Sequence, residues 1–421
     1  MNTQNLRRTF RGPVHRPGDE QYDAQRAAFN PNLDARPMVI AEATGPADVR
    51  AAVTWARDHD LPLAVQATGH GTKVPSNGGL LIKTHRMATV LVDPDRRVAK
   101  IGPGARWGDV VAAAAPFGLA PLSGDTASVG VAGYTFGGGF SLLSRKYGFA
   151  ADSLVRAELV TADGSLVTAG HDRNADLFWA VRGGSGNFGV ATSLEVRLYP
   201  VAEVYAGVVR FPAERAAETL AYFQEWAATA PDELATAVIV DKGETFTIKT
   251  LYVGAPADAR RLLRPLWSVA GPPVEEKLAT VRYADVKLPG VAPRTFDLYA
   301  SLPDNVVDLV APDSPVTAVE VKHWGGAMAR PVAGAGPAGR RELPFSIGYN
   351  GPAEAGVSVR RHARGSFVNF LSDPRAVETA FAPENFRRLR EIKRAYDPEN
   401  VFRFNVNIAP AARSADLVAA R

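Results

Sequence analysis

The chain has 421 residues, of which 46% are apolar and 22% charged, and its net charge is +4 at pH 7. This length exceeds the usual size of a single hydrophobic core, so we expect two domains. Lysine and arginine are scattered among acidic residues rather than clustered with aromatics, a pattern that does not favour a nucleic-acid partner. The sequence contains no cysteine, which excludes disulfides, iron–sulfur clusters, thiolate zinc sites and a cysteine nucleophile.

The N-terminus is basic but lacks the apolar segment of an export signal. No window approaches the roughly eighteen uninterrupted apolar residues that a membrane-spanning helix needs. These two observations predict a soluble, cytoplasmic protein with no membrane partner.

The first half of the chain alternates short strands with amphipathic helices. A predicted helix over 45–61 has Pro46 in its first turn, and another over 108–117 ends at Gly118, a residue that commonly stops helices. Two alternating apolar runs within 154–170 predict a β-hairpin. Further strands are predicted at 37–41, 63–66, 79–82, 89–92 and 97–101.

Residues 122–152 are unusually rich in glycine, with glycines at 124, 130, 133, 137, 138, 139 and 148. Glycine permits positive φ and close backbone approach, but it costs conformational entropy on folding. A run this dense therefore indicates that a flat or phosphorylated ligand lies against the backbone. His70 lies at the tip of a separate small-residue loop, and on its own it is more typical of a surface or capping residue.

A second glycine motif, formed by Gly184, Gly186 and Gly189, matches the G-x-G-x-x-G pattern of dinucleotide-binding proteins. Here the motif follows a predicted helix and leads into a strand over 190–198. A Rossmann loop must follow a strand and open a helix, so that the helix N-terminus faces the pyrophosphate. We therefore reject NAD as the ligand.

The composition changes near residue 201, where a β-α-β-β-α series begins that predicts an antiparallel sheet covered on one face by helices. A glycine- and proline-rich loop over 330–339 is expected to be flexible. We expect a first domain over 1–200, with its core at about 35–200, a second domain over 201–375 and a C-terminal segment over 376–421. The predicted elements of the second half are strands at 205–211, 234–241, 245–253, 316–323, 344–349 and 365–371 and helices at 212–229, 255–269 and 383–396.

Other chemistries find little support in the sequence. The seven histidines lack metal-ligand spacing, so no metal site is expected, and His323 on an alternating strand is interpreted as a packing or solvent-facing residue. The sequence contains neither a P-loop nor a G-x-S-x-G nucleophile elbow.

Five segments of the chain form a set: QATGHG at 66–71, SGDTASVGVAGYTFGGGFSLLSRKYGFAAD at 123–152, VTADGS at 160–165, NADLFWAVRGGSGNFGV at 174–190 and the tail YDPENVFRFNVNI. Together they resemble the berberine bridge enzyme-like oxidases, which belong to the vanillyl-alcohol oxidase and p-cresol methylhydroxylase (PCMH) class of FAD proteins. The resemblance implies an α+β fold. It consists of a PCMH-type FAD-binding domain with two subdomains, followed by a substrate domain whose antiparallel sheet is covered by helices.

The resemblance also implies which residues hold FAD. His70 matches the histidine that this family bonds to the flavin 8α-methyl, so we expect a covalent link there. Thr126 stands where relatives often carry a second, cysteinyl link, so one link at most is possible and a lower flavin potential is expected. The implied cofactor residues are Ala67, Thr68, Gly69, His70, Gly71, Gly124, Thr126, Ser128, Val129, Gly130, Gly133, Gly138, Gly139, Gly189, Val190, Asn405 and Asn407.

Four residues are candidates for catalysis: Glu320, Lys322, Tyr349 and Asn369. The alternating strand 316–323 places on one face the residues Val316, Ala318, Glu320 and Lys322. Either this face lies over the flavin, or Glu320 and Lys322 form an exposed ion pair on a solvated sheet face. Burial over the flavin would move the pKa values of this pair toward working pH.

The chain has Phe370 where alcohol-oxidising relatives carry a tyrosine base. Tyrosine-assisted alcohol oxidation is therefore in doubt. Amine oxidation, or the use of Glu320 or Tyr349 as the base, stays open.

These features predict an FAD-dependent oxidase that takes hydride from a C–H beside nitrogen or oxygen of a small, partly hydrophobic metabolite, with O₂ as the acceptor. Two alternatives remain open, a dehydrogenase with another acceptor and a flavoprotein that sequesters a redox-active molecule. The sequence fixes neither the substrate nor the oligomeric state.

Overall fold

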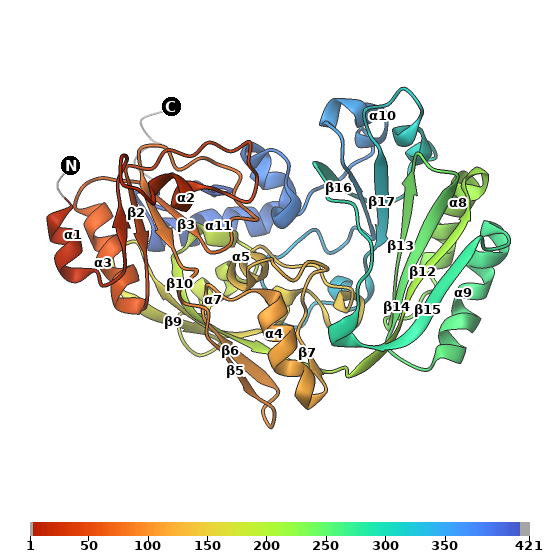
Figure 1. Ribbon diagram of the computed structural model, residues 1–421, viewed down its shortest axis with the longest axis horizontal. Helices are drawn as coiled ribbons and strands as arrows, with labels where there is room; N and C mark the ends of the chain where they lie inside the picture. The colour runs from red at the N-terminus through yellow and green to blue at the C-terminus, as the bar shows by residue number, and fades with distance from the viewer. Residues whose placement is uncertain (1–2, 413–421) are drawn as a thin grey trace.

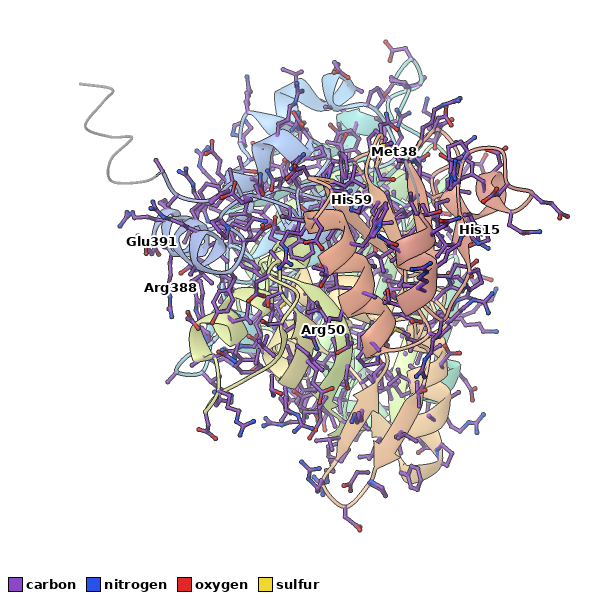
Figure 2. The ribbon with its side chains drawn as sticks, turned by 90° about the vertical axis from the view of Figure 1, so that its left-hand side faces the viewer. His15, Met38, Arg50, His59, Arg388 and Glu391 are labelled. Atoms are coloured by element: carbon purple, nitrogen blue, oxygen red, sulfur yellow. The ribbon has the colours of Figure 1, made fainter. Side chains whose placement is uncertain are left out.

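The computed structural model describes residues 3–412 and begins with a four-stranded sheet in the order β1-β2-β4-β3. The strands β2, β4 and β3 are parallel, and β1 joins β2 antiparallel. Figure 2 shows helix α3 lying across this sheet, with Arg50 labelled on the helix and His59 just after its C-terminal end. Trp55 of α3 and Val39 of β2 are buried in one core there. The elements are α1 (Gln4–Thr9), β1 (Val14–His15), α2 (Tyr22–Arg26), β2 (Val39–Glu42), α3 (Pro46–Arg57), β3 (Leu63–Gln66) and β4 (Leu80–Lys83).

A second, five-stranded antiparallel sheet follows in the order β5-β6-β10-β8-β9. Helix α11 (Pro383–Tyr396) returns from the far end of the chain to pack on α7, where Arg388 lies over the ring of Trp179. The elements are β5 (Val90–Asp93), β6 (Val98–Ile101), α4 (Trp107–Ala114), β7 (Leu119–Ala120), α5 (Val131–Phe136), α6 (Ser144–Tyr147), β8 (Leu154–Val160), β9 (Leu166–Gly170), α7 (Ala175–Val181), β10 (Val190–Arg197) and β11 (Tyr199–Pro200).

The context of the second glycine motif is as predicted. Helix α7 ends at Val181, a 3₁₀ turn covers Ser185–Asn187, and strand β10 begins at Val190. The motif therefore opens a strand rather than a helix, and the reason for rejecting a Rossmann loop is confirmed.

The third sheet has seven antiparallel strands in the order β15-β12-β14-β13-β17-β18-β16. Helices α8 and α9 cover the face that looks away from the two smaller sheets (Figure 1). The elements are β12 (Glu203–Pro212), α8 (Ala216–Ala227), β13 (Leu234–Asp241), β14 (Thr245–Tyr252), α9 (Pro256–Ala270), β15 (Glu275–Arg282), β16 (Thr295–Tyr299), β17 (Ala318–His323), β18 (Phe345–Tyr349) and α10 (Val357–Arg360). The α+β class and the helix-covered antiparallel sheet are confirmed.

In the seven-stranded sheet, two strands, β15 and β16, were not predicted, and the strand predicted over 365–371 is absent. β15 lies at the edge of its sheet and carries polar residues on both faces, so the apolar alternation that marks a strand is missing. The predicted strand over 365–371 is instead an irregular segment with a 3₁₀ turn at Val368–Phe370, bridged to Leu298 through Gly365.

The alternation along β17 is as predicted from Val319 onward. Val319 and Val321 belong to the helix-side core, so Glu320 and Lys322 lie on the opposite face. Val316 also lies in the helix-side core, because it precedes the first strand residue, Ala318, and is outside the regular alternation. Its predicted orientation was therefore wrong.

Buried arginines join the third sheet to the preceding part of the chain. Arg145 of α6 donates from Nε to the Leu234 carbonyl at 2.7 Å and contacts Nε2 of His323 through Nη1 at 2.8 Å. Arg341 forms two bonds to the carboxylate of Asp152, at 2.7 and 3.0 Å. These contacts fix the third sheet against the glycine-rich region.

The loop over 330–339 is packed in its second half. Ala338 is 1% exposed, and a Cβ placed on Gly183 would lie 2.5 Å from the Cα of Ala338. Val332, near the start of the loop, is exposed. The prediction of a flexible loop therefore does not hold for the half that contains Ala338.

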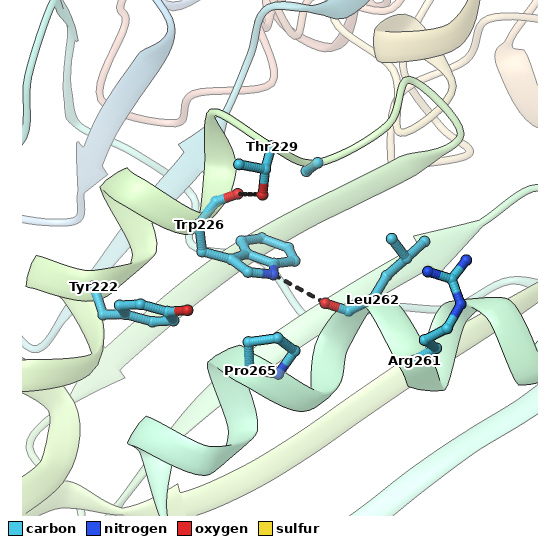
Figure 3. A pocket seen from close by; sticks show the side chains of 7 residues that line it. Tyr222, Trp226, Thr229, Arg261, Leu262 and Pro265 are labelled. Atoms are coloured by element: carbon cyan, nitrogen blue, oxygen red, sulfur yellow. Dashed lines mark hydrogen bonds between the residues drawn. The ribbon is translucent and has the colours of Figure 1, made fainter.

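Two cavities lie away from the predicted site residues. One of about 230 Å³ lies between α8 and α9, where Trp226 Nε1 donates to the Leu262 carbonyl beside Pro265 (Figure 3). A groove of about 720 Å³ is lined by residues around Arg57 and Tyr396. No helix within residues 3–412 is long and apolar enough to cross a membrane.

Candidate functional site

His70 is held on both ring nitrogens in the loop that follows β3. Nδ1 lies 3.1 Å from Thr68 Oγ1, and Nε2 lies 3.2 Å from Ser128 Oγ in the glycine-rich stretch. Phe29 stacks on the imidazole with ring centroids 3.9 Å apart. Burial and the nearby Arg106 lower the pKa of His70, so the ring is neutral at pH 7. A neutral imidazole in a fixed orientation is a potential nucleophile or ligand contact.

The glycine-rich stretch uses its glycines in two different ways. A Cβ on Gly133, in α5, would meet no described atom within 4 Å, so that backbone is open. Gly139 instead has φ +70°, and a Cβ there would lie 2.5 Å from Cε1 of Tyr134 and 2.7 Å from Cβ of Ala150. The Cα of Gly133 is thus open on its side-chain face, whereas Gly139 permits the tight turn after α5.

Asn369 stabilises this turn with its whole carboxamide. Its Oδ1 accepts from the Gly139 N–H at 2.9 Å, and its Nδ2 donates to the carbonyls of Tyr134 at 3.3 Å and Gly133 at 3.4 Å. Asn369 was predicted as a catalytic candidate, but its hydrogen-bonding groups are occupied by backbone. Its contacts are those of a residue that positions the glycine-rich stretch.

The C-terminal tail contacts the second glycine motif through asparagines. Nδ2 of Asn405 donates to the Gly186 carbonyl at 3.0 Å. Asn187 donates to the Val406 carbonyl and accepts from the Ile408 N–H. The sequence analysis missed Asn187, although an asparagine inside a glycine motif is a plausible signal for a backbone-binding side chain.

Two residue sets therefore form from the predicted cofactor residues. The loop Ala67, Thr68, Gly69, His70 and Gly71 meets the stretch that holds Gly124, Thr126, Ser128, Val129, Gly130, Gly133, Gly138 and Gly139, and a Cβ on Gly130 would lie 3.1 Å from Thr68 Oγ1. In the second set, the tail with Asn405 and Asn407 meets the turn before Gly189 and Val190.

The uncovered face of the seven-stranded sheet carries a buried ion-pair network, which we call the roof network: Asp125, Lys249, Glu320 and Lys322. Lys249 Nζ lies 2.7 Å from Glu320 Oε1 and 3.2 Å from Asp125 Oδ2, and Lys322 Nζ lies 3.1 Å from Glu320 Oε2. Ala237 pairs with Lys249 on one side and Lys322 on the other, which places both lysines in one row across the sheet.

This face looks toward the glycine-rich region. Leu251, two residues after Lys249 on β14, is buried in the core that also holds Val131 and Tyr134 of α5. Asp125 itself belongs to the glycine-rich stretch, so its ion pair with Lys249 spans the two parts of the protein. The segment after β15 completes the enclosure, because the Pro289 carbonyl accepts from Lys249 and the Val291 N–H donates to Glu320.

The network holds both carboxylates in the charged form. Burial alone would raise the pKa of Glu320, but Lys322 and Lys249 outweigh it and keep that pKa below its ordinary value. The pKa of Asp125 is lowered in the same way, with burial opposed by Lys249 and Lys322. The expectation that burial moves the pKa of Glu320 toward working pH was therefore wrong, because two ammonium groups lie within reach.

Aromatic rings flank the network on the side of β17. Lys322 Nζ lies 5.8 Å from the ring centroid of Phe140, which stacks on Trp324 at 4.7 Å. Phe370 stacks on Phe296 at 4.7 Å. Phe140 and Phe370 are only partly buried, so this aromatic wall presents apolar surface beside the Lys322 ammonium.

Tyr349 lies apart from the other catalytic candidates. It is fully buried in the helix-side core, and its hydroxyl donates to the Ala353 carbonyl at 3.3 Å. Burial also raises its pKa. Tyr349 is therefore on the opposite face of the sheet from Glu320 and Lys322.

The sequence analysis missed Asp125, Lys249 and Tyr283 as site residues. Lys249 is the single charge within the apolar run of β14, a pattern that indicates a buried lysine with a carboxylate partner. Tyr283 contacts Ser123 Oγ through its hydroxyl at 3.1 Å, and burial raises its pKa, so it is a hydrogen-bonding group rather than a base.

The first part of the chain fits the expected FAD. A Cβ on Gly71 or Gly133 would meet no described atom within 4 Å, so a ligand can approach the Cα atoms of both glycines. Consecutive small residues of this kind expose N–H groups suited to a pyrophosphate. The buried Oδ1 atoms of Asn405 and Asn407 have no hydrogen-bond partner within residues 3–412. Unpaired buried acceptors of this kind suit a ligand that brings its own donors.

Comparison with known proteins also points to an FAD-binding protein. A family model for an FAD-binding domain matches residues 37–170, and one for berberine and berberine-like proteins matches 366–409. The FAD-linked oxidoreductase YvdP of Bacillus subtilis is 30% identical, over 94% of this chain and 97% of that protein. (R)-6-Hydroxynicotine oxidase of Paenarthrobacter nicotinovorans is 27% identical, over 96% and 97%. The crystal structure of 6-hydroxy-D-nicotine oxidase from Arthrobacter nicotinovorans superposes with a TM-score of 0.86 at 26% identity, covering 98% of this chain and 100% of that one.

Proposed function

We propose that this chain, which belongs to the berberine bridge enzyme-like family of FAD-linked oxidoreductases, is an oxidase. Its proposed substrate is a small, partly hydrophobic metabolite. The substrate loses hydride from a C–H bond beside nitrogen or oxygen. When bound, FAD supplies the hydride acceptor at N5 and a route for the electrons to O₂, which leaves as H₂O₂. In this proposal residues 1–200 bind FAD, 201–375 bind the substrate, and 376–421 return to the FAD-binding part.

The observation that carries the proposal is the roof network. A charged network buried on the sheet face that looks toward the glycine-rich stretch is costly to fold unless its charges serve a ligand or are fully paired. Its Asp125–Lys249 ion pair joins the proposed cofactor part to the proposed substrate part. Polar side chains between a cofactor and a substrate part can bind a substrate and hold it in a fixed orientation over the cofactor.

The state of the network favours a substrate that needs no strong base. Glu320 is held as a carboxylate with a lowered pKa, which makes it a weak proton acceptor. Asn369 is bound to backbone, and Phe370 cannot take a proton. A neutral amine can release hydride without prior deprotonation, so we propose a C–H beside nitrogen as the bond that is oxidised.

We propose that His70 carries a single covalent link to FAD. The neutral, stacked imidazole and its contacts with Thr68 and Ser128 support this role. The test is acid precipitation of the purified protein, followed by an absorbance spectrum and intact mass. Colour that stays with the polypeptide, and that moves to the supernatant in His70→Ala, supports the link, whereas release of FAD from the wild type contradicts it.

The oxidase function itself is tested by anaerobic reduction. A panel of small amines and alcohols is mixed with the FAD-loaded protein, and bleaching of the flavin identifies a substrate. Air is then admitted, and reoxidation with formation of H₂O₂ supports the proposal. Bleaching that is reversed only by a dye acceptor indicates a dehydrogenase, and tight ligand binding without bleaching indicates a sequestering flavoprotein.

The contribution of the roof network is tested with Glu320→Ala and Lys322→Met. If these side chains orient the substrate, each variant reduces the rate of flavin bleaching. An unchanged rate in both variants removes Glu320 and Lys322 from the reaction.

A further inference from the structure

The four charges of the roof network are engaged to different extents. Lys249 donates to Asp125 and to the Pro289 carbonyl and forms an ion pair with Glu320 at 2.7 Å, so its ammonium is surrounded by oxygen atoms. Lys322 contacts one oxygen of Glu320, and among residues 3–412 no second carboxylate lies within 4 Å of its ammonium. Its side chain is 16% exposed, whereas that of Lys249 is 1% exposed. Lys322 is therefore the cation of this network that retains free donors at an accessible surface.

The free donors of Lys322 lie beside the aromatic wall. Phe140 is the nearest ring, and it is held in place by its stacking on Trp324. Because Phe140 is only partly buried, a planar ligand can pack on it while a polar substituent reaches Lys322. An ammonium with two unused N–H groups at an apolar surface binds an anionic oxygen more strongly than a neutral acceptor.

From this arrangement we propose that the substrate carries a carboxylate on or beside an aromatic ring. Lys322 binds the anion, Glu320 orients Lys322, and the ring packs against Phe140. This inference rests on the proposed function, because it names the substrate class of the same site. It assigns Lys322 the role of a specificity-determining residue.

Asp125 is the competing recognition group, because its side chain is 29% exposed and could bind a cation instead. The Asp125 carboxylate already faces Lys249 at 3.2 Å, whereas Lys322 lies over the ring of Phe140. The positions of the rings therefore favour the anion at Lys322 over a cation at Asp125.

The experiment measures binding of three probes to the oxidised, FAD-loaded protein: benzoate, benzamide and benzylamine. The perturbation of the flavin absorbance or titration calorimetry gives each dissociation constant. We expect benzoate to bind the wild type more tightly than the other two probes. Lys322→Met weakens benzoate binding about tenfold to a hundredfold and changes benzamide binding by less than about twofold, as expected for the loss of one charge-assisted hydrogen bond.

Two further variants control the result. Lys277→Met removes an exposed lysine from edge strand β15 of the same sheet and leaves benzoate binding unchanged. Lys322→Arg keeps the charge and restores most of the affinity that Lys322→Met loses. FAD content and the thermal unfolding midpoint of each variant identify any variant that has lost its fold.

Three outcomes overturn the proposal: equal benzoate affinity in the wild type and Lys322→Met, no benzoate binding to the wild type, or tighter binding of benzylamine that Asp125→Asn abolishes. The last outcome identifies a cationic substrate. Binding to the oxidised protein needs no turnover, so benzoate recognition can succeed even if no amine or alcohol bleaches the flavin. In that case the proposed substrate class stands and the oxidase proposal fails. If instead an amine or alcohol bleaches the flavin but benzoate does not bind, the oxidase proposal stands and the proposed substrate class fails.

Discussion

The glycine-rich region and the roof network face one another but are built by different means. The glycine-rich region obtains its shape from backbone conformation, with Gly138 and Gly139 at positive φ and Asn369 bound to main-chain groups. The roof network obtains its properties from side-chain charges, with Lys249 and Glu320 almost fully buried. A backbone site depends on residues that cannot be replaced without strain, whereas a side-chain site changes with a few substitutions. In the proposed function, a cofactor site built from backbone would thus face a substrate site built from side-chain charges.

Substitution of Gly139 by alanine should give the largest effect and tests the backbone half of this comparison. The new Cβ would lie 2.5 Å from a ring carbon of Tyr134, at a residue with φ +70°. Left-handed strain and overpacking together should lower the free energy of unfolding by about 4 kcal/mol. Urea denaturation of the FAD-loaded protein measures the loss.

Gly133→Ala is the matched control for Gly139→Ala. A Cβ at Gly133 meets no described atom within 4 Å and lies in helix α5, so the fold should keep its stability. Because that backbone is proposed to face FAD, the variant should instead retain less cofactor after purification. Equal stability of the two alanine variants would contradict the division between tight-turn and open glycines.

Substitution of Lys249 by methionine tests the side-chain half. The variant leaves Glu320, which is 3% exposed, with Lys322 as its remaining cationic partner. It also removes the ammonium group closest to Asp125. Breaking a buried ion pair from one side costs several kcal/mol, and we expect a loss of about 3 kcal/mol in the urea experiment. Adding Glu320→Gln to Lys249→Met should recover more than half of that loss. A double variant less stable than Lys249→Met would show that the charge of Glu320 is not the cause.

The two halves also differ in how far sequence alone could predict them. The motifs around His70 and the glycine-rich stretch follow local rules, and strands β3 and β13 and helix α11 begin and end at the predicted residues. The shared face of Glu320 and Lys322 followed from strand alternation. These features depend on residues close together in the sequence.

The contacts of Lys249 with Asp125 and Glu320 could not be predicted in this way. Asp125 and Lys249 are 124 residues apart, and their contact depends on how the third sheet lies against the glycine-rich stretch. The same holds for Asn369, whose backbone partners lie 230 residues or more away. Sequence spacing gives the residue types of such a network but not its pairing, and so the pKa direction of Glu320 was predicted wrongly.

The contact between Arg145 and His323 should make the association of the third sheet with the rest of the chain sensitive to pH. Burial and Arg145 lower the pKa of His323 from 6.5 to about 3. Between these values the unfolded chain binds a proton that the folded protein does not, so stability falls as pH falls below about 6.5. At pH 5 the loss relative to pH 7.5 should be about 2 kcal/mol.

Urea midpoints measured from pH 7.5 to pH 5 test this dependence. His323→Gln removes the titrating group and keeps an acceptor for Arg145, so the slope between pH 6.5 and pH 5 should become shallower. His362→Gln, at an exposed position, should retain the wild-type slope. Identical slopes in the wild type and His323→Gln would assign the pH dependence to other groups.

Lys322→Met should give the smallest change in stability and separates the two lysines of one network. Both lysines contact Glu320, but Lys322 is 16% exposed and has one carboxylate oxygen as its partner, whereas Lys249 is 1% exposed and has two carboxylates. Partly solvated ion pairs contribute little, so we expect a loss of about 1 kcal/mol in urea, well below that of Lys249→Met. A loss as large as that of Lys249→Met would mean that Lys322 is a structural member of the network. A small loss of unfolding free energy would mean that the fold does not need the charge of Lys322. Substitution of Lys322 could then alter substrate recognition without disturbing the sheet or the glycine-rich region.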